Sequence, residues 1–218
     1  MVENTQRAHD RRLVIFDVDG TLTRVTSIWQ YLLERTGRWR GEGEVNLARF
    51  LAGAIDYAEF CRLDAGLLKG QRYDDLKQLA RQVPTYDGLE AVFAYFRARG
   101  FQIGLLSTGL KLLTDVLAER YPVDCCVVND LAWQDGRCTG EGIVRVAWHG
   151  KGEAAAAMIR ASGAADVVAF GDSSGDVPVF RLADFRVAVN ATDPELLRLA
   201  SYRHVGDDLS ACLPHLPF

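Results

Sequence analysis

The stretch that decides the fold is residues 13–23, which reads Leu-Val-Ile-Phe-Asp-Val-Asp-Gly-Thr-Leu-Thr. Its four leading apolar residues are typical of a short strand buried on both faces; a buried helix segment would give the same run, but Gly20 marks a turn and favours the strand. Asp17 and Asp19 then follow the carboxyl end of that strand, where open α/β sheets bind their ligands. The stretch therefore predicts an acidic site at the end of a first, central strand.

The two carboxylates of Asp17 and Asp19 restrict the chemistry of this site. Neighbouring carboxylates repel, so one takes up a proton unless a cation lies between them or the two have different roles. Asp17 is thus a candidate nucleophile and Asp19 a candidate general acid and base. Carboxylate nucleophiles form aspartyl-phosphates, and a hard divalent cation would hold a phosphate against one. The alternative is a structural Asp-Gly turn, since both residues are common in turns.

The composition of the 218 residues is that of a globular protein, with 49% hydrophobic and 25% charged residues. A net charge of −4 argues against nucleic acid as a partner. The five cysteines include no Cys-x-x-Cys pair, so a disulfide framework or a zinc site is not expected. Residues 1–12 lack the apolar core of a signal peptide, and no apolar run is long enough to cross a membrane. These features predict a soluble, cytoplasmic protein.

The pattern after Thr23 becomes helical and stays so to about Val83. Apolar residues at helical spacing predict four helices, which carry or span residues 28–32, 47–55, 57–68 and 73–83. We expect residues 24–83 to form an inserted helical cap that closes over the crevice and excludes water. The alternative is that these helices cover one face of the sheet, but parallel crossovers usually need one helix each.

Strands and helices alternate from Tyr86 onward. The sequence therefore predicts an α/β fold, in which a Rossmann-like parallel sheet is flanked by helices and a small all-helical cap is inserted after the first strand. The α/β core comprises residues 1–23 and 84–218. Asp135-Gly136 predicts a hairpin turn within this second part.

Two segments of the second part are candidate anion-binding elements. A strand over residues 101–106 runs into Ser107-Thr108-Gly109 before a predicted helix, where backbone N–H groups can bind an anion. An ordinary helix N-cap would use the same residues. Lys151 lies at the start of a predicted alanine-rich helix. The positive end of the helix dipole disfavours a cation at this position, and a bound anion next to Lys151 would offset the unfavourable interaction.

A second acidic strand end follows the apolar residues 166–170. The sequence there continues as Gly171-Asp172-Ser173-Ser174-Gly175-Asp176. Two acidic strand ends in one small domain predict a Mg²⁺ site, because Mg²⁺ prefers a few carboxylates together with water and phosphate oxygens.

In their order, these segments resemble the four motifs of the haloacid dehalogenase-like superfamily of phosphatases, and the helical insertion is similar to the cap of its phosphoserine phosphatase-like branch. The resemblance implies hydrolysis of a small phosphate ester. Asp17 would attack phosphorus and Asp19 would act as acid and base. The remaining roles implied are phosphate binding by Ser107, Thr108, Gly109 and Lys151, Mg²⁺ binding by Asp17, the Asp19 backbone carbonyl and Asp172, and support of the metal site by Asp176.

The cap departs from the phosphoserine phosphatase pattern. Members of that branch carry a Glu soon after the first motif and a cap Arg, which bind the substrate's ammonium and carboxylate. This chain has no acidic residue between Thr21 and Gln30, and Asp64 falls where the Arg is expected. Gly175 also replaces a common Asn. These differences argue against phosphoserine as the substrate.

Three cap residues are candidates for contact with the rest of the substrate. Trp29 can stack on a ring, and Arg24 or Arg62 can pair with a second anionic group. The alternative for Trp29 is packing within the cap. Two other functions stay open at this point: a phosphosugar mutase or phosphotransferase, and a non-catalytic binding protein on the same fold. The sequence predicts no oligomeric state.

Overall fold

A seven-stranded sheet in the order β4-β3-β2-β1-β5-β6-β7 is the centre of the computed structural model, which describes residues 11–218. β3 and β4 are antiparallel, and all other neighbours are parallel. The strands are β1 (Arg12–Phe16), β2 (Phe101–Leu110), β3 (Cys125–Gln134), β4 (Arg137–Ile143), β5 (Asp166–Gly171), β6 (Phe185–Val189) and β7 (Tyr202–His204). The predicted α/β fold with a Rossmann-like sheet is confirmed. Most of the polar segment 1–12 lies outside the described residues.

β1 is buried on both faces, as its sequence predicts. It pairs with β2 on one side and β5 on the other. Val14 and Phe16 point into one hydrophobic cluster and Leu13 and Ile15 into the other, each with 1% exposure or less. Because side chains alternate along a strand, a continuous apolar run is what two covered faces require.

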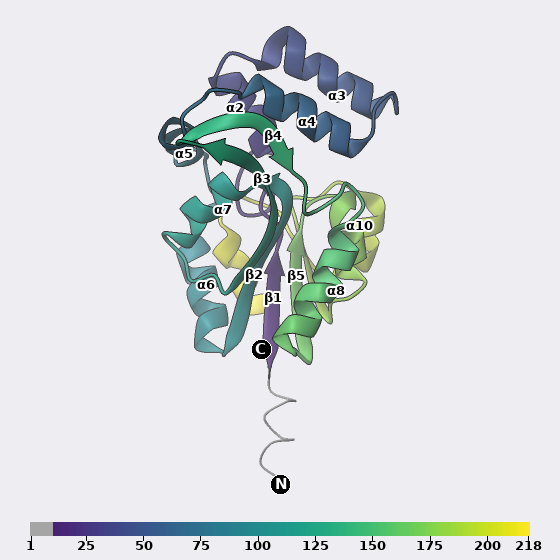
Figure 1. Cartoon of the computed structure of the whole chain (residues 1–218). Helices are drawn as coiled ribbons and strands as arrows, with labels where there is room; N and C mark the ends of the chain where they lie inside the picture. Colours follow the sequence, from purple (N-terminus) through teal and green to yellow (C-terminus); the bar gives the residue numbers. More distant parts are fainter. Residues whose placement is uncertain (1–10) are drawn as a thin grey trace.

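Helices cover the two faces of the sheet in separate groups (Figure 1). Members of each group share a hydrophobic cluster with one face of β1. The first group is α6 (Leu89–Ala98), α7 (Lys111–Ala118) and η3 (Leu209–His215); the second is α8 (Lys151–Ser162), α9 (Val177–Phe180), which follows the turn η2 (Ser174–Asp176), and α10 (Pro194–Leu199). Within residues 11–218, none of the helices has the length and apolar character needed to cross a membrane.

Residues 24–83, which lie between β1 and α6, contain no strand, and the four predicted helices are present. Figure 1 shows α3 and α4 above the carboxyl ends of the central strands. The hairpin of β3 and β4 extends up to them, and Cys138 in β4 exchanges backbone hydrogen bonds with Gly70 and Gln71. The elements of this segment are α2 (Ile28–Arg35), the irregular turn η1 (Trp39–Gly43), α3 (Glu44–Leu51), α4 (Tyr57–Leu67) and α5 (Tyr73–Ala80).

Two strands are longer than the sequence pattern predicts. β2 continues past Leu106 through Ser107-Thr108-Gly109 to Leu110, and its register with β3 shifts between Ser107 and Leu110. β3 is one strand of ten residues that leads into the predicted hairpin turn. Asp135 and Gly136 have φ angles of 49° and 72°, the left-handed conformations that a two-residue hairpin turn needs.

Candidate active site

The chain turns sharply where β1 ends. The carbonyl of Val18 accepts hydrogen bonds from the backbone N–H groups of Leu22 and Thr23, at 2.9 and 3.1 Å. Gly20 has a φ of +83°, and a Cβ atom there would collide with the carboxylate of Asp172. Glycine is therefore required both for the turn and for the close approach of the second acidic strand end.

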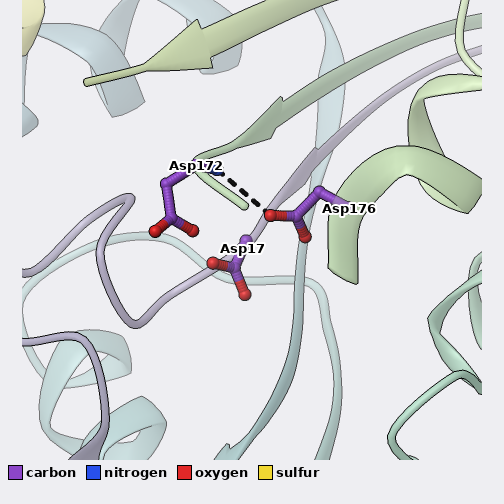
Figure 2. A group of neighbouring side chains, drawn as sticks. All are labelled: Asp17, Asp172 and Asp176. Carbon is purple, nitrogen blue, oxygen red and sulfur yellow. Dashed lines mark hydrogen bonds between the residues drawn. The ribbon is translucent and has the colours of Figure 1, made fainter. Parts of the chain in front are cut away.

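Three carboxylates from two strand ends meet at this turn (Figure 2). Asp17 follows β1, whereas Asp172 and Asp176 follow β5, and each offers an oxygen within 4.8 Å of the others. β1 and β5 are adjacent and parallel, so their carboxyl ends bring these side chains together. The sequence prediction that the two acidic strand ends converge is confirmed.

Lys151 is the cation that balances this cluster. Its Nζ donates to Asp17 Oδ1 at 2.6 Å and to Asp176 Oδ1 at 2.7 Å, and all three side chains are buried. Burial by itself would lower the pKa of Lys151, but the two carboxylates raise it above its usual value. The lysine is therefore charged, and it fixes the orientation of Asp17 while neutralising part of its charge.

The hydrogen bonds of the cluster distinguish the roles of its carboxylates. Asp176 uses Oδ1 for Lys151 and Oδ2 for the backbone N–H groups of Asp172 and Ser173, at 3.1 and 3.2 Å. Among the described residues, by contrast, the Asp172 carboxylate has only a long contact from the Thr21 hydroxyl, at 3.4 Å. Asp176 is thus committed to holding the loop and Lys151, and Asp172 keeps oxygens available for a ligand.

The donor set suits a hard divalent cation. Burial, followed by the charges of Asp17 and Asp176, raises the pKa of Asp172, so the ionised cluster is electrostatically unfavourable by itself. A cation between Asp17 and Asp172 would relieve that repulsion, and all the available donors are oxygens, as Mg²⁺ requires. The residues therefore fit Mg²⁺.

The Asp19 carboxylate lies against Gly109 of β2. Its Oδ1 is buried and has no hydrogen-bond partner among the described residues, and a Cβ atom on Gly109 would collide with its Oδ2. Burial, and then the charge of Asp17, raises the pKa of Asp19 to about 7. A carboxyl group that keeps a proton near neutral pH suits general acid–base work.

Ser107, Thr108 and Gly109 form one wall of the cavity that the carboxylates line. The Ser107 hydroxyl accepts from the backbone N–H of Gly109 at 2.9 Å. The Thr108 carbonyl accepts from Trp29 Nε1 at 3.2 Å and from the Tyr57 hydroxyl at 3.2 Å. All three residues line one cavity with Asp17, Asp19, Lys151 and Asp172. These seven predicted residues lie together.

Asn129 in β3 holds this wall in place, although sequence analysis did not single it out. Its side chain is fully buried. Nδ2 donates to the carbonyls of Thr108 and Val146 at 3.0 and 3.1 Å, and Oδ1 accepts from the N–H groups of Arg145 and Val146. The sequence does contain a signal for this positioning role, an asparagine that follows the apolar residues of a predicted strand. A buried side-chain amide needs several hydrogen-bond partners and therefore holds neighbouring segments together.

The three cap residues singled out from the sequence have different positions. Trp29 lines the cavity and is only 7% exposed. Arg24 instead pairs with Asp87 and Asp207 at 3.3 and 3.4 Å. Arg62 points to solvent and pairs with Glu59 at 2.6 Å. Neither arginine is part of the cavity lining.

The sheet order and the buried acidic cavity define a class of α/β protein with an aspartate-based site at the carboxyl edge of a parallel sheet. The chain belongs to the family described as haloacid dehalogenase-like hydrolase, whose model matches residues 14–181. The protein is therefore a hydrolase, and the resemblance seen in its sequence is confirmed.

Similar proteins within this family are named phosphoserine phosphatase. The one from Methanocaldococcus jannaschii is 24% identical over 182 residues, covering 82% of this chain and 85% of the relative. The one from Streptomyces coelicolor is 27% identical over 184 residues, covering 83% of this chain but 44% of the longer relative. A solved structure described as a phospho-aspartyl intermediate analogue of phosphoserine phosphatase has a TM-score of 0.78 at 23% identity and covers 94% of this chain and 99% of its own. That likeness shows the same fold.

Proposed function

We propose that the chain is a Mg²⁺-dependent phosphomonoester hydrolase that acts through an aspartyl-phosphate on Asp17. The observation that carries this proposal is the position of the Asp17 carboxylate. It is 4% exposed, is oriented by Lys151 and by the Thr21 hydroxyl at 3.1 Å, and lines a cavity that Asp19 also lines. A fixed, partly neutralised carboxylate is suited to attack phosphorus.

In the first step, an oxygen of Asp17 forms a bond to phosphorus and the bond from phosphorus to the ester oxygen breaks. Asp19 donates its proton to the departing alkoxide, which leaves as the alcohol. In the second step, Asp19 takes a proton from water while the water oxygen bonds to phosphorus. The bond to Asp17 breaks, and inorganic phosphate and the ionised Asp17 are released.

The other residues of the cavity hold the phosphoryl group. The Ser107 hydroxyl, the backbone N–H groups beside it and the Lys151 ammonium are assigned to the phosphoryl oxygens. Mg²⁺ held by Asp17 and Asp172 would neutralise phosphate charge and bring two anions together. Asp176 keeps Lys151 and the β5 loop in position and does not itself contact the substrate.

We assign residues 24–83 to a cap and residues 1–23 and 84–218 to the α/β core. Helices α3 and α4 contribute Phe50 and Tyr57 to the cavity, whereas Asp17 and Lys151 belong to the core. A site divided in this way can be closed around a small ester and protected from water. The substrate is thus a small phosphorylated metabolite.

A phosphate-release assay with Mg²⁺ tests the proposed function. The panel comprises an aryl phosphate and phosphorylated amino acids, amino alcohols, sugars and nucleotides. Wild type is expected to release phosphate from the aryl phosphate, and Asp17→Asn is expected to be at background. Asp115→Asn, which changes a half-buried carboxylate that is paired with Lys111 and does not line the cavity, is the matched control and should keep its activity. Wild type that leaves every ester of the panel intact would refute the proposal.

A further inference from the structure

The cavity that holds the catalytic carboxylates also has an aromatic wall. The cavity has a volume of about 350 Å³, small for a ligand site. Ring centroids of Phe50 and Trp148 are 5.2 Å apart, those of Phe50 and Phe60 are 5.0 Å apart, and those of Tyr57 and Trp148 are 5.8 Å apart. The aromatic wall consists of Trp29, Trp39, Phe50, Tyr57, Phe60 and Trp148.

One charged group stands in this wall, the carboxylate of Asp64 on α4. It lines the cavity, is 1% exposed, and accepts a hydrogen bond from Asn46 at 2.9 Å. No cation pairs with it among the described residues. Burial raises the pKa of Asp64 to about 6, so the group is largely ionised at pH 7.5. The wall therefore has a negative charge beside aromatic faces.

Among the described residues, the same lining has no positive charge that is free to pair with a substrate carboxylate. In the part of the chain that the structure describes, Lys151 is the one basic residue that lines the cavity, and it is engaged by Asp17 and Asp176. Arg24 and Arg62 are paired elsewhere on the surface. A carboxylate on the alcohol part of a substrate would lie near Asp64 with no cation to offset the repulsion.

A positively charged group on the substrate would be attracted where a carboxylate would be repelled. Aromatic faces attract cations through the ring quadrupole, most strongly when water is excluded, and Asp64 adds a direct attraction. A primary ammonium must place three N–H donors, and the wall offers chiefly carbon faces. A fully alkylated ammonium has no such donors to satisfy, so it fits an aromatic wall with one carboxylate better.

Building on the proposed function, we propose that the cavity selects phosphate monoesters of small amino alcohols whose nitrogen is a quaternary ammonium and which carry no carboxylate. The phosphate occupies the site around Asp17, and the ammonium lies against the aromatic wall beside Asp64. Phosphoserine, which carries a carboxylate, is then a poor substrate.

The test compares phosphocholine with its neutral carbon isostere, 3,3-dimethylbutyl phosphate, and with phosphoserine. The two isosteres share size and shape, but the ammonium of choline withdraws electrons and makes it the better leaving group. The change in the ratio of their kcat/KM values between wild type and a wall variant therefore isolates the attraction of the wall for the positive charge. Wild type should prefer phosphocholine by at least about ten-fold, the size expected for a cation held by aromatic rings without water. Phosphoserine should give the lowest kcat/KM of the three.

Variants test whether the preference for phosphocholine over its carbon isostere arises from the aromatic wall and Asp64. Asp64→Asn should lower the ratio several-fold without abolishing the preference, because the direct attraction to the carboxylate is lost while the aromatic rings remain. Glu59→Gln, on the same helix but paired with exposed Arg62, should keep the wild-type ratio. If Asp64→Asn does not fold, Trp148→Ala, at a side chain that is 44% exposed, serves instead and should also lower the ratio. Equal hydrolysis of the two isosteres by wild type, or preference for phosphoserine, would overturn the inference. A wild-type enzyme inactive even on the aryl phosphate would instead overturn the proposed function.

Discussion

Lys151 shows how a single residue supports the whole acidic site. Lys151 is 5% exposed, and its ammonium lies between the two buried carboxylates of Asp17 and Asp176, with that of Asp172 close by. Removal of one partner from a buried ion pair leaves uncompensated charge in a medium of low polarity. The lysine thus has a structural role in addition to any contact with phosphate.

Lys151→Met is therefore expected to lower the free energy of unfolding by about 3–5 kcal/mol. Urea unfolding at pH 7.5 without metal measures this loss. Addition of Mg²⁺ should restore part of it, because a bound cation would compensate the same carboxylates. A variant as stable as wild type without metal would contradict the assigned charge balance.

The contribution of Asp19 to the rate is expected to increase with the basicity of the leaving-group oxygen. A general acid contributes most when the departing oxygen is strongly basic. Asp19→Asn should lower kcat/KM, which reports the steps up to departure of the alcohol, by about 10²–10⁴-fold for an alkyl phosphate. The loss in kcat/KM should be clearly smaller for p-nitrophenyl phosphate, whose leaving group departs without a proton. Equal losses on the two esters would show that Asp19 does not act as the acid.

Among the elements, β3 links the catalytic wall to the cap through Asn129. The Asn129 amide supports the carbonyl of Thr108 in β2 and donates to the Tyr57 hydroxyl of α4 at 3.2 Å. Truncation leaves several buried backbone groups without partners, and each costs about 1–3 kcal/mol. The same contacts position the ring of Tyr57 and the backbone that precedes Trp148.

Asn129→Ala is accordingly expected to destabilise the fold by at least about 1–3 kcal/mol and to raise KM more than it lowers kcat. Thermal unfolding and steady-state kinetics on the aryl phosphate measure the two effects. Thr139→Ala, in the neighbouring strand β4, removes one half-exposed hydroxyl bonded to Ala132 and is the milder control. A drop in kcat alone would contradict a positioning role.

Local sequence predicts some of these elements well and others poorly. β1 was predictable because Gly20, which follows the apolar run and Asp17, favours a covered strand and a turn over a buried helix. The end of β2 was not, because Ser107-Thr108-Gly109 also has the composition of a helix cap, and the pairing with β3 that extends the strand is not visible locally. The apolar spacing on α3 correctly predicted a helix, but Phe50 lines the cavity and Leu51 is 69% exposed, so this face is not core.

At the scale of the whole molecule, contacts between distant residues were predictable only where a rule of sheet topology relates the two partners. The acidic strand ends could be brought together because parallel strands end at the same edge of the sheet. The ion pair between Arg24 and Asp87 joins residues 63 apart, and no sequence pattern indicates it. The sequence showed that Asp64 stands where an arginine is expected in the phosphoserine phosphatase-like branch. Only the structure shows that this carboxylate lies beside an aromatic wall.

A ligand that binds only the folded chain stabilises the whole molecule. Mg²⁺ is expected to raise the melting temperature of wild type. At a Mg²⁺ concentration of roughly a hundred times its Kd, the gain in free energy of unfolding is about 2.7 kcal/mol. Asp172→Asn should lose most of this shift, and Asp166→Asn, an exposed carboxylate at the other end of β5, should keep it. Chelation should abolish activity while the fold is retained. An equal shift in both variants would exclude Asp172 as a ligand.

The most direct test of the account is detection of the phosphoryl group on Asp17. Wild type is mixed with excess aryl phosphate and Mg²⁺, stopped within milliseconds by acid, digested and analysed by peptide mass spectrometry. The account predicts one added phosphoryl group on the peptide that contains residues 13–23, absent in Asp17→Asn and removed on incubation with hydroxylamine, which cleaves acyl phosphates. Release of phosphate at the wild-type rate with no modification of that peptide, or with the modification on another residue, would contradict it.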